Sequence, residues 1–218
     1  MKCHHWTRAI LVGLALLTAG CEPEKPAETA PPAGDLTAVR ERNELVVLTR
    51  NAPTTYYIDR DGRPAGLEAD LTKAFAEHLG VTVRYKVLDS LEEILVALAE
   101  GKGDLAAAGL TRTETRQDQF LNSISYQMVR QQVVCRRDGQ RPSDLEALIG
   151  VQMAVVAHSS YVDQLRQLQS EYTQLDWRAL EGTDTEKLLE MVCREEIDCT
   201  VADSNIVAVN RRYRPELV

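Results

Sequence analysis

The sequence predicts an α/β fold with two lobes that contain mainly parallel sheets. Three observations predict it: short apolar runs alternate with helical patterns from residue 36 onward, this alternation occurs twice, and the two runs divide near residues 126–132. Strands that alternate with helices form parallel sheets, because each helix carries the chain back across a face of the sheet. We therefore expect lobe 1 over residues 36–128 and lobe 2 over residues 129–218.

The elements of lobe 1 follow from hydrophobic spacing and from residues that begin or end helices. The expected order is strand 44–49, helix 69–79, strand 81–88, helix 90–101 and strand 105–108. The first helix has Leu71, Phe75 and Leu79 at helical spacing and ends at Gly80. The second begins at Ser90, which stands in capping-box spacing with Glu93.

Lobe 2 repeats the pattern with different side chains. The expected order is strand 131–135, a helix opened by Ser143 and Glu146, strand 153–156, a helix capped at Ser159 and Ser160, strand 175–180, a helix opened by Thr183 and Glu186, and strand 199–201. Polar residues follow these apolar runs, as in Gly109–Thr111, Ser159–Ser160 and Asp203. Ligands of such sheets lie beyond the carboxyl ends of the strands, so we expect a small-molecule site there.

Composition and charge exclude several classes of function. The 218 residues carry a formal net charge of −8, and the Lys and Arg residues are scattered rather than gathered in a stripe. We expect no nucleic-acid partner for such a chain. No His, Cys and Asp residues stand at metal-ligand spacing and no glycine-rich phosphate loop occurs, so we expect neither a metal nor a cofactor.

The first 35 residues have the pattern of a membrane-anchored leader. Lys2 and Arg8 flank an apolar run at 9–17 that is too short to span a bilayer. Residues 18–21, ending in Cys21, resemble the bacterial lipoprotein signal, which implies a signal peptide over residues 1–20 and a lipid on Cys21. The alternative is an ordinary secreted precursor in which Cys21 is incidental.

A proline-rich tether follows over residues 21–35. In the lipoprotein interpretation Glu22 follows the lipidated residue. The resemblance then implies the periplasmic face of the outer membrane of a Gram-negative cell.

Three stretches resemble signature regions of the family 3 extracellular solute-binding proteins. They are "GLEADLTKAFAEHLG" at 66–80, "GDLAAAGLTRTETR" at 103–116 and "IDCTVADS" at 197–204. Within that family, "TVADS" and "RRYRPELV" resemble the regulatory domain of membrane-bound lytic murein transglycosylase F. The resemblance implies a periplasmic-binding-protein-like fold whose C-terminal return to lobe 1 is missing here, and a parent enzyme whose catalytic domain is absent.

The resemblance also implies a carboxylate-binding site. In family 3 binders the residues aligned with Gly109, Thr111 and Arg116 hold the carboxylate of the ligand. A guanidinium suits this role because it makes two parallel charge-assisted bonds to a planar carboxylate. The residues alone leave another interpretation open, in which Arg116 pairs with Glu114 or Asp118 on an exposed helical turn.

The other end of the ligand is assigned to Asp203, whose counterpart in the family receives the ammonium group. The alternative role of Asp203 is to cap a helix that starts at Ser204. Ser159 and Ser160 are expected to donate hydrogen bonds to the ligand. His158 stands where many relatives have glycine, which puts a backbone contact there in question.

The first loop departs from simple amino-acid binders. Arg50 replaces an acid that is common after the first strand, and Pro53 replaces a frequent aromatic residue. Tyr56 and Tyr57 are the available aromatic walls of the site, although either can instead belong to the core. We therefore expect a small zwitterionic ligand with an α-carboxylate, either an amino acid or a small peptide.

The remaining cysteines allow one disulfide. Cys193 and Cys199 are separated by a helix-to-strand turn and can pair in an oxidising compartment, or remain unpaired. Cys135 is then expected to be a buried, inert thiol.

The leading hypothesis for function is a non-catalytic binding module, with a lytic domain or a transporter as its partner. A lytic partner would make the chain the sensor part of a transglycosylase, and a transporter partner would make it an amino-acid-binding component of an ABC transporter. The third hypothesis is a dehydratase-like enzyme on the same fold, in which Asp203 is the candidate acid.

Overall fold

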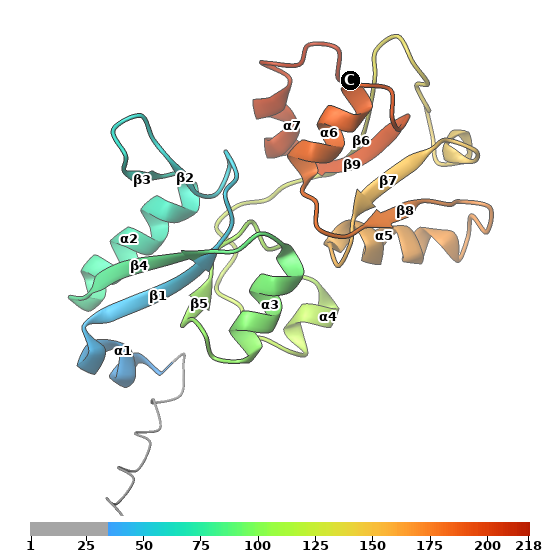
Figure 1. The fold of residues 1–218 in the computed structure, drawn as a ribbon. Helices are drawn as coiled ribbons and strands as arrows, with labels where there is room; N and C mark the ends of the chain where they lie inside the picture. Colours follow the sequence, from blue (N-terminus) through green and yellow to red (C-terminus); the bar gives the residue numbers. More distant parts are fainter. Residues whose placement is uncertain (1–34) are drawn as a thin grey trace, which may run out of the picture. The chain divides into compact units, whose positions relative to one another are not determined.

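A computed structural model describes residues 35–218 of the chain, all of which belong to one compact unit. The expected signal peptide, Cys21 and almost all of the expected tether lie outside these residues. The described part has the alternating strands and helices that the sequence predicts, arranged around two larger sheets, with a further two-stranded hairpin (Figure 1). Of the helices at residues 35–218, none has the length and apolar character needed to cross a membrane.

The first sheet is parallel, with strand order β4-β1-β5 (Figure 1). Its elements are α1 (Leu36–Arg42), β1 (Glu44–Thr49), α2 (Leu67–Leu79), β4 (Thr82–Val87), α3 (Leu91–Ala99) and β5 (Leu105–Ala106), with a hairpin of β2 (Tyr57–Ile58) and β3 (Pro64–Ala65) between β1 and α2. Strand β1 is in the centre and is buried from Leu45 to Thr49. Ser90 accepts a hydrogen bond from the backbone N–H of Glu93, so the expected N-terminus of α3 is confirmed.

Helix α2 lies where the sequence predicts, but its apolar face is not its buried face. Leu71 and Phe75 are 41% and 38% exposed, whereas Ala69 and Ala76 are buried. Ala76 packs with Leu45 of β1, and a small side chain lets the helix approach the sheet closely. The spacing of Leu71, Phe75 and Leu79 therefore located this helix correctly, although only Leu79 of the three packs against the core.

The second sheet has strand order β6-β9-β7-β8, in which only β6 and β9 are antiparallel. Its elements are β6 (Gln131–Cys135), the 3-10 helix η1 (Glu146–Leu148), β7 (Met153–Val156), α5 (Ser160–Gln169), β8 (Arg178–Leu180), α6 (Thr185–Cys193), β9 (Cys199–Asp203) and α7 (Ser204–Asn210). Its core joins the central strand residues Ala154 and Ala202 to Leu188 and Leu189 of α6.

Two expected capping boxes in this half are wrong by one residue. Asp184, not Thr183, caps α6, and its carboxylate accepts from the backbone N–H of Lys187 at 2.7 Å. Asp144, not Ser143, accepts from Ala147 N–H, and only the short η1 follows. In both places the carboxylate next to the hydroxyl residue takes the cap, because Asp is at least as strong an N-cap as Ser or Thr.

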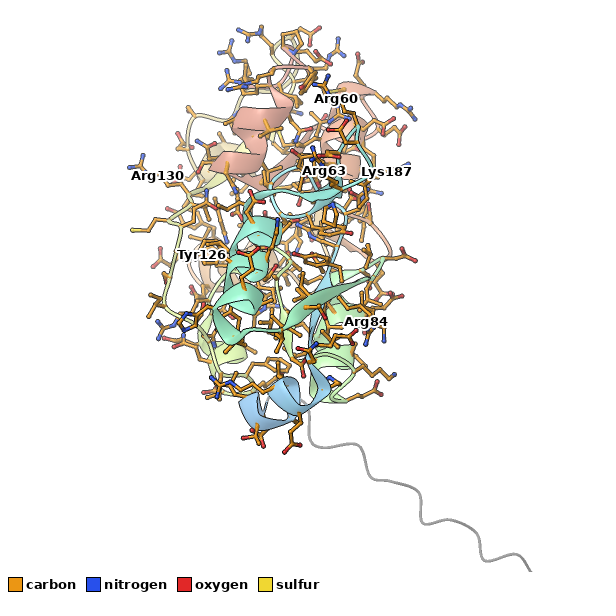
Figure 2. The ribbon with its side chains drawn as sticks, turned by 90° about the vertical axis from the view of Figure 1, so that its left-hand side faces the viewer. Arg60, Arg63, Arg84, Tyr126, Arg130 and Lys187 are labelled. Carbon is orange, nitrogen blue, oxygen red and sulfur yellow. A yellow bond between two sulfur atoms is a disulfide. The ribbon has the colours of Figure 1, made fainter. Side chains whose placement is uncertain are left out.

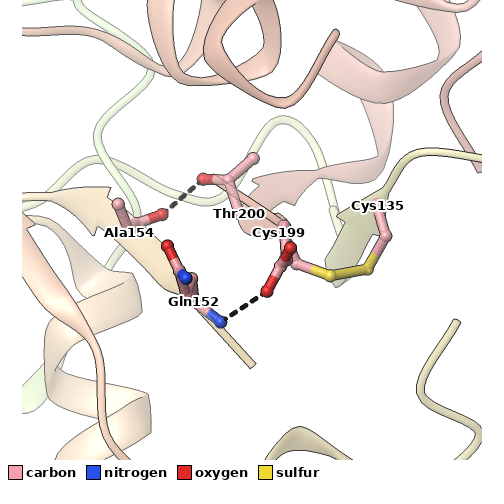
Figure 3. Close-up of a disulfide and its surroundings, with 6 residues drawn as sticks. Cys135, Gln152, Ala154, Cys199 and Thr200 are labelled. Carbon is pink, nitrogen blue, oxygen red and sulfur yellow. Dashed lines mark hydrogen bonds between the residues drawn. A yellow bond between two sulfur atoms is a disulfide. The ribbon is translucent and has the colours of Figure 1, made fainter. Parts of the chain in front are cut away.

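The disulfide that was considered between Cys193 and Cys199 does not form, and the expected free thiol at Cys135 is wrong. The disulfide joins Cys135 to Cys199 (Figure 3). Cys193 forms no disulfide within residues 35–218. Cys135 and Cys199 are directly opposite each other in the antiparallel pair β6–β9, with Cα atoms 4.3 Å apart. Strand pairing brings these two residues together although 64 positions separate them in sequence. Cys193 is the last residue of α6 and takes no part in this strand pair.

Candidate ligand-binding site

Two adjoining cavities lie where strands of both sheets end. The smaller has a volume of about 30 Å³ and the larger about 290 Å³. Four residues line both of them, namely Arg50, Gly109, Thr111 and Asp203. Arg50 follows β1 and Asp203 is the last residue of β9, so the site is at the carboxyl ends of the strands, as expected for this kind of sheet.

The smaller cavity gathers six of the seven side chains or backbone positions that the sequence indicated. They are Gly109, Thr111, Arg116, Ser159, Ser160 and Asp203. The seventh, Tyr56, lines neither cavity. It is buried against Tyr85, with ring centroids 4.8 Å apart, so it belongs to the core and forms no wall of the site.

Arg116 is a buried cation without a carboxylate partner. It lies on the short helix α4 (Glu114–Gln117), and only 9% of it is exposed. Its Nη1 donates to the Thr111 carbonyl at 2.9 Å and its Nη2 to the His158 carbonyl at 3.1 Å. No ion pair joins it to Glu114, Asp118 or any other acid among residues 35–218. Burial lowers the pKa of Arg116, although a guanidinium stays charged at any physiological pH.

Asp203 is a buried acid with one unpartnered oxygen. It is 8% exposed, and its Oδ1 has no hydrogen-bond partner within the described part of the chain. Burial raises the pKa of Asp203, an effect that the Tyr161 hydroxyl and the charge of Arg50 oppose. Asp203 stands at the N-cap position of α7, but its side chain makes no capping bond. The capping alternative is therefore not what the structure shows.

The two serines lie at the start of α5, and their hydroxyls are already engaged. Ser159 donates to the Val156 carbonyl at 2.6 Å, so its hydroxyl does not cap the helix as expected. Ser160 accepts from Gln131 Nε2 at 3.1 Å. Because a hydroxyl both donates and accepts, Ser160 keeps its proton for a ligand. His158 has φ +56, the left-handed conformation that glycine adopts most easily.

Gly109 lines the site with its backbone and is hydrogen-bonded to Glu68, a residue that was not among the predicted site residues. Its φ is +68, and a Cβ on it would be 3.1 Å from the Thr55 side chain, so only glycine fits without strain. Its N–H donates to Glu68 Oε2 at 2.8 Å. The other oxygen of Glu68 accepts from the hydroxyl of Tyr126, which Figure 2 shows beside α2.

Glu68 is therefore a buried support for the Gly109 backbone. Burial raises the pKa of Glu68, while the Tyr126 and Gly109 hydrogen bonds lower it. A sequence signal was present: Glu68 precedes the small residue Ala69, and both lie on the face of α2 that turned out to be buried. Tyr161 and Thr185, which also line the smaller cavity, carried no comparable signal.

The chemistry of the site suits a molecule with charges of both signs. One buried guanidinium and one buried carboxylate line the same small cavity, and neither has an ion-pair partner among residues 35–218. A buried charge is costly unless it is paired. A ligand that carries a carboxylate and an ammonium group supplies both partners at once.

Comparison with known proteins identifies the class. Residues 45–176 match the model of the bacterial extracellular solute-binding proteins, family 3, and the chain belongs to this family. The chain is 43% identical over 212 residues to membrane-bound lytic murein transglycosylase F of Maricaulis maris, covering 96% of this chain and 45% of that protein. It is 42% identical to membrane-bound lytic murein transglycosylase F 1 of Alkalilimnicola ehrlichii, covering 94% of this chain and 42% of the relative. The chain thus spans less than half the length of these relatives.

Solved structures establish the predicted periplasmic-binding-protein-like fold. An ancestral arginine-binding protein bound to arginine is 26% identical, with a TM-score of 0.72 and coverage of 81% of this chain and 78% of that one. An ancestral amino-acid-binding protein, a precursor of cyclohexadienyl dehydratase, is 25% identical, with a TM-score of 0.71 and coverage of 85% and 80%.

Proposed function

We propose that this chain is a non-catalytic module that binds an amino acid or a small peptide through its two charged ends. One observation carries the proposal: Arg116 and Asp203 are both buried at the same cavity, and neither has an ion-pair partner in the described structure. In this proposal Arg116 and Thr111 hold the carboxylate, and Asp203 holds the ammonium group.

Closure of two lobes around the ligand is the second part of the proposal. We propose residues 36–128 and 129–218 as the lobes, with the three-stranded sheet in the first range and the four-stranded sheet in the second. A contact of Arg116 supports closure of the two lobes. Arg116 is on α4, and it donates a hydrogen bond to the carbonyl of His158, which follows β7 of the other sheet. A ligand that contacts both lobes binds the closed form better than the open form, so it shifts the population toward closure.

The similarity to transglycosylase F favours a sensor role at the cell envelope. The relatives are named as membrane-bound enzymes that act on murein, and this chain matches less than half of each. We propose that the module is lipid-anchored through Cys21 at the periplasmic face of the outer membrane, where occupancy regulates a wall-cleaving partner. The similarity to arginine-binding proteins favours a second candidate, the amino-acid-binding component of an ABC transporter.

Calorimetric titration of the purified chain with amino acids and short peptides tests the binding site. Arg116→Ala and Asp203→Asn should each weaken binding by at least about tenfold, because losing one partner of a desolvated charge pair typically costs about 2–5 kcal/mol. Arg112→Ala is the matched control, since Arg112 is exposed and donates to Gln117 Oε1. If Arg112→Ala weakens binding as much as Arg116→Ala does, the loop attracts anions in general and the carboxylate clamp is wrong.

Membrane fractionation tests the anchor. The wild-type chain should pellet with membranes, and Cys21→Ser should leave an unprocessed precursor without lipid. Recovery of the wild type as a freely soluble periplasmic protein would contradict the anchor and leave the binding proposal intact.

A further inference from the structure

Arg50 is a second guanidinium at the site, and its role is not explained by a simple zwitterionic ligand. It follows the last residue of β1 and lines both cavities. Its Nε donates to the Ala108 carbonyl at 3.2 Å, which fixes the direction of the side chain. Its two terminal nitrogens make no hydrogen bond or ion pair to any residue from 35 to 218.

The charges at the cavities do not balance for a neutral ligand. The side chains that line the smaller cavity include two guanidiniums, Arg50 and Arg116, but only one carboxylate, Asp203. Burial raises the pKa values of Glu68 and Glu186 and the nearby charge of Arg50 opposes this, but neither carboxylate lines either cavity. Glu68 is also bonded to Gly109 and Tyr126 instead.

A zwitterion pairs its carboxylate with one guanidinium and its ammonium group with Asp203. One guanidinium then remains unpaired in a partly desolvated place, which is unfavourable. A second acidic group on the ligand removes this cost. The larger cavity, of about 290 Å³, adjoins the smaller one along Arg50 and gives space for the rest of such a molecule.

We propose that Arg50 is a specificity-determining residue that binds a second carboxylate of the ligand. The ligand class is then a monoamino dicarboxylic acid, or a short peptide that contains one. The inference rests on the proposed function, because it takes the pairing of Arg116 and Asp203 with the ligand's α-carboxylate and ammonium group as given.

Pairs of probes that differ only in one charge give a direct test. The probes are L-glutamate against L-glutamine and L-alanyl-L-glutamate against L-alanyl-L-glutamine, titrated calorimetrically into the purified chain. The acidic member of at least one pair should bind about tenfold tighter, because a charge-assisted bond to guanidinium is lost in the amide. Arg50→Gln should reduce that ratio to about threefold or less, because it removes the guanidinium that binds the second carboxylate of the ligand.

Two further variants serve as controls for Arg50→Gln. Arg84→Gln removes an exposed guanidinium that lines neither cavity and should leave the ratio unchanged. Arg50→Lys keeps the charge and should retain part of the preference, even if Arg50→Gln fails to fold. Thermal melts of each variant show whether it is folded.

The outcomes separate this inference from the proposed function. Equal binding of acid and amide by the wild type, or a preference that survives Arg50→Gln, overturns the role of Arg50 while the clamp of Arg116 and Asp203 stands. A wild type that binds none of the probes but binds a monocarboxylate amino acid also overturns the role of Arg50 alone. Absence of binding to any amino acid or peptide overturns the proposed function, and this inference with it.

Discussion

Asp203 shows at the scale of one residue how a binding site costs stability. Its Oδ1 has no partner within the described structure, although only 8% of the residue is exposed. A buried polar group without a partner costs about 1–3 kcal/mol. In the proposed function the ligand's ammonium group supplies that partner, so the ligand-free chain carries the cost.

This cost predicts a pH-dependent effect of Asp203→Asn on the ligand-free chain. Because burial raises the pKa of Asp203, the folded chain holds a proton over a pH window above the ordinary Asp value in which the unfolded chain has released it. The free energy of unfolding therefore falls as the pH rises through that window. At pH 7 Asp203→Asn should raise the free energy of unfolding by about 1 kcal/mol, and the gain should vanish below the ordinary pKa of Asp.

Urea unfolding of both chains at pH 3.5 and pH 7 measures the difference. The wild type measured at the same pH is the reference for the variant at each pH. If Asp203→Asn is less stable than the wild type at pH 7, Asp203 stabilises the ligand-free fold through the charge of Arg50, and the expected cost of its unpartnered oxygen is wrong.

Residues in strand-end motifs were easier to predict as candidate site residues than Tyr56 and Glu68 were to place. Arg116, Gly109 and Asp203 stand in motifs that follow strands, and motif position was enough to bring them to one cavity. Tyr56 was misplaced because an aromatic residue after a strand packs equally well inward, and here Tyr85 offers it a partner. Glu68 was missed because its two partners, Gly109 and Tyr126, are 41 and 58 residues away in sequence.

At the scale of elements, order was easier to predict than faces, caps and cross-links. The strands at 44–49, 131–135 and 153–156 are confirmed residue by residue, because each contains at least three consecutive apolar residues. In helix α2 the small residue Ala76 packs against the sheet, whereas Phe75 is 38% exposed. The caps shifted by one residue at Ser143 and Thr183, where an aspartate directly follows the expected hydroxyl residue.

The disulfide between β6 and β9 makes a clear prediction at this scale. Cys135 and Cys199 are separated by 64 positions, and closing a loop of that length restricts the unfolded chain. Replacing both by alanine should lower the free energy of unfolding by about 2–4 kcal/mol. Cys193→Ser should change it little, because Cys193 forms no disulfide within the described residues. Denaturant unfolding of the oxidised and reduced protein measures both effects.

Peptide mapping of the oxidised chain decides the pairing itself. A cross-linked peptide that contains Cys193 and Cys199 would restore the pairing expected from the sequence. A reduced chain as stable as the oxidised one would show that the bond adds nothing to the β6–β9 ladder.

At the scale of the whole described chain, the site depends on two sheets that share no strand pairing. The smaller cavity takes Gly109 and Arg116 from beyond β5 and Ser160 and Asp203 from the elements of the second sheet. Contacts between the two halves near the cavity include the hydrogen bond from Arg116 to the His158 carbonyl and the approach of His158 Nε2 to Glu92 Oε2 at 3.4 Å. A ligand that pairs with both Arg116 and Asp203 therefore links the two halves more strongly than these contacts alone.

This linkage predicts that a bound ligand protects both sheets together. At a free ligand concentration of 100 times Kd, the free energy of unfolding should rise by about 2.7 kcal/mol, because the ligand binds only the folded chain. Hydrogen exchange should slow in β1 of the first sheet and in β9 of the second by a similar factor. Arg116→Ala should remove the protection of both strands at the same ligand concentration, whereas Arg112→Ala should keep it. Protection confined to β9 would mean that the second sheet holds the ligand by itself, and the two-lobed clamp would then be wrong.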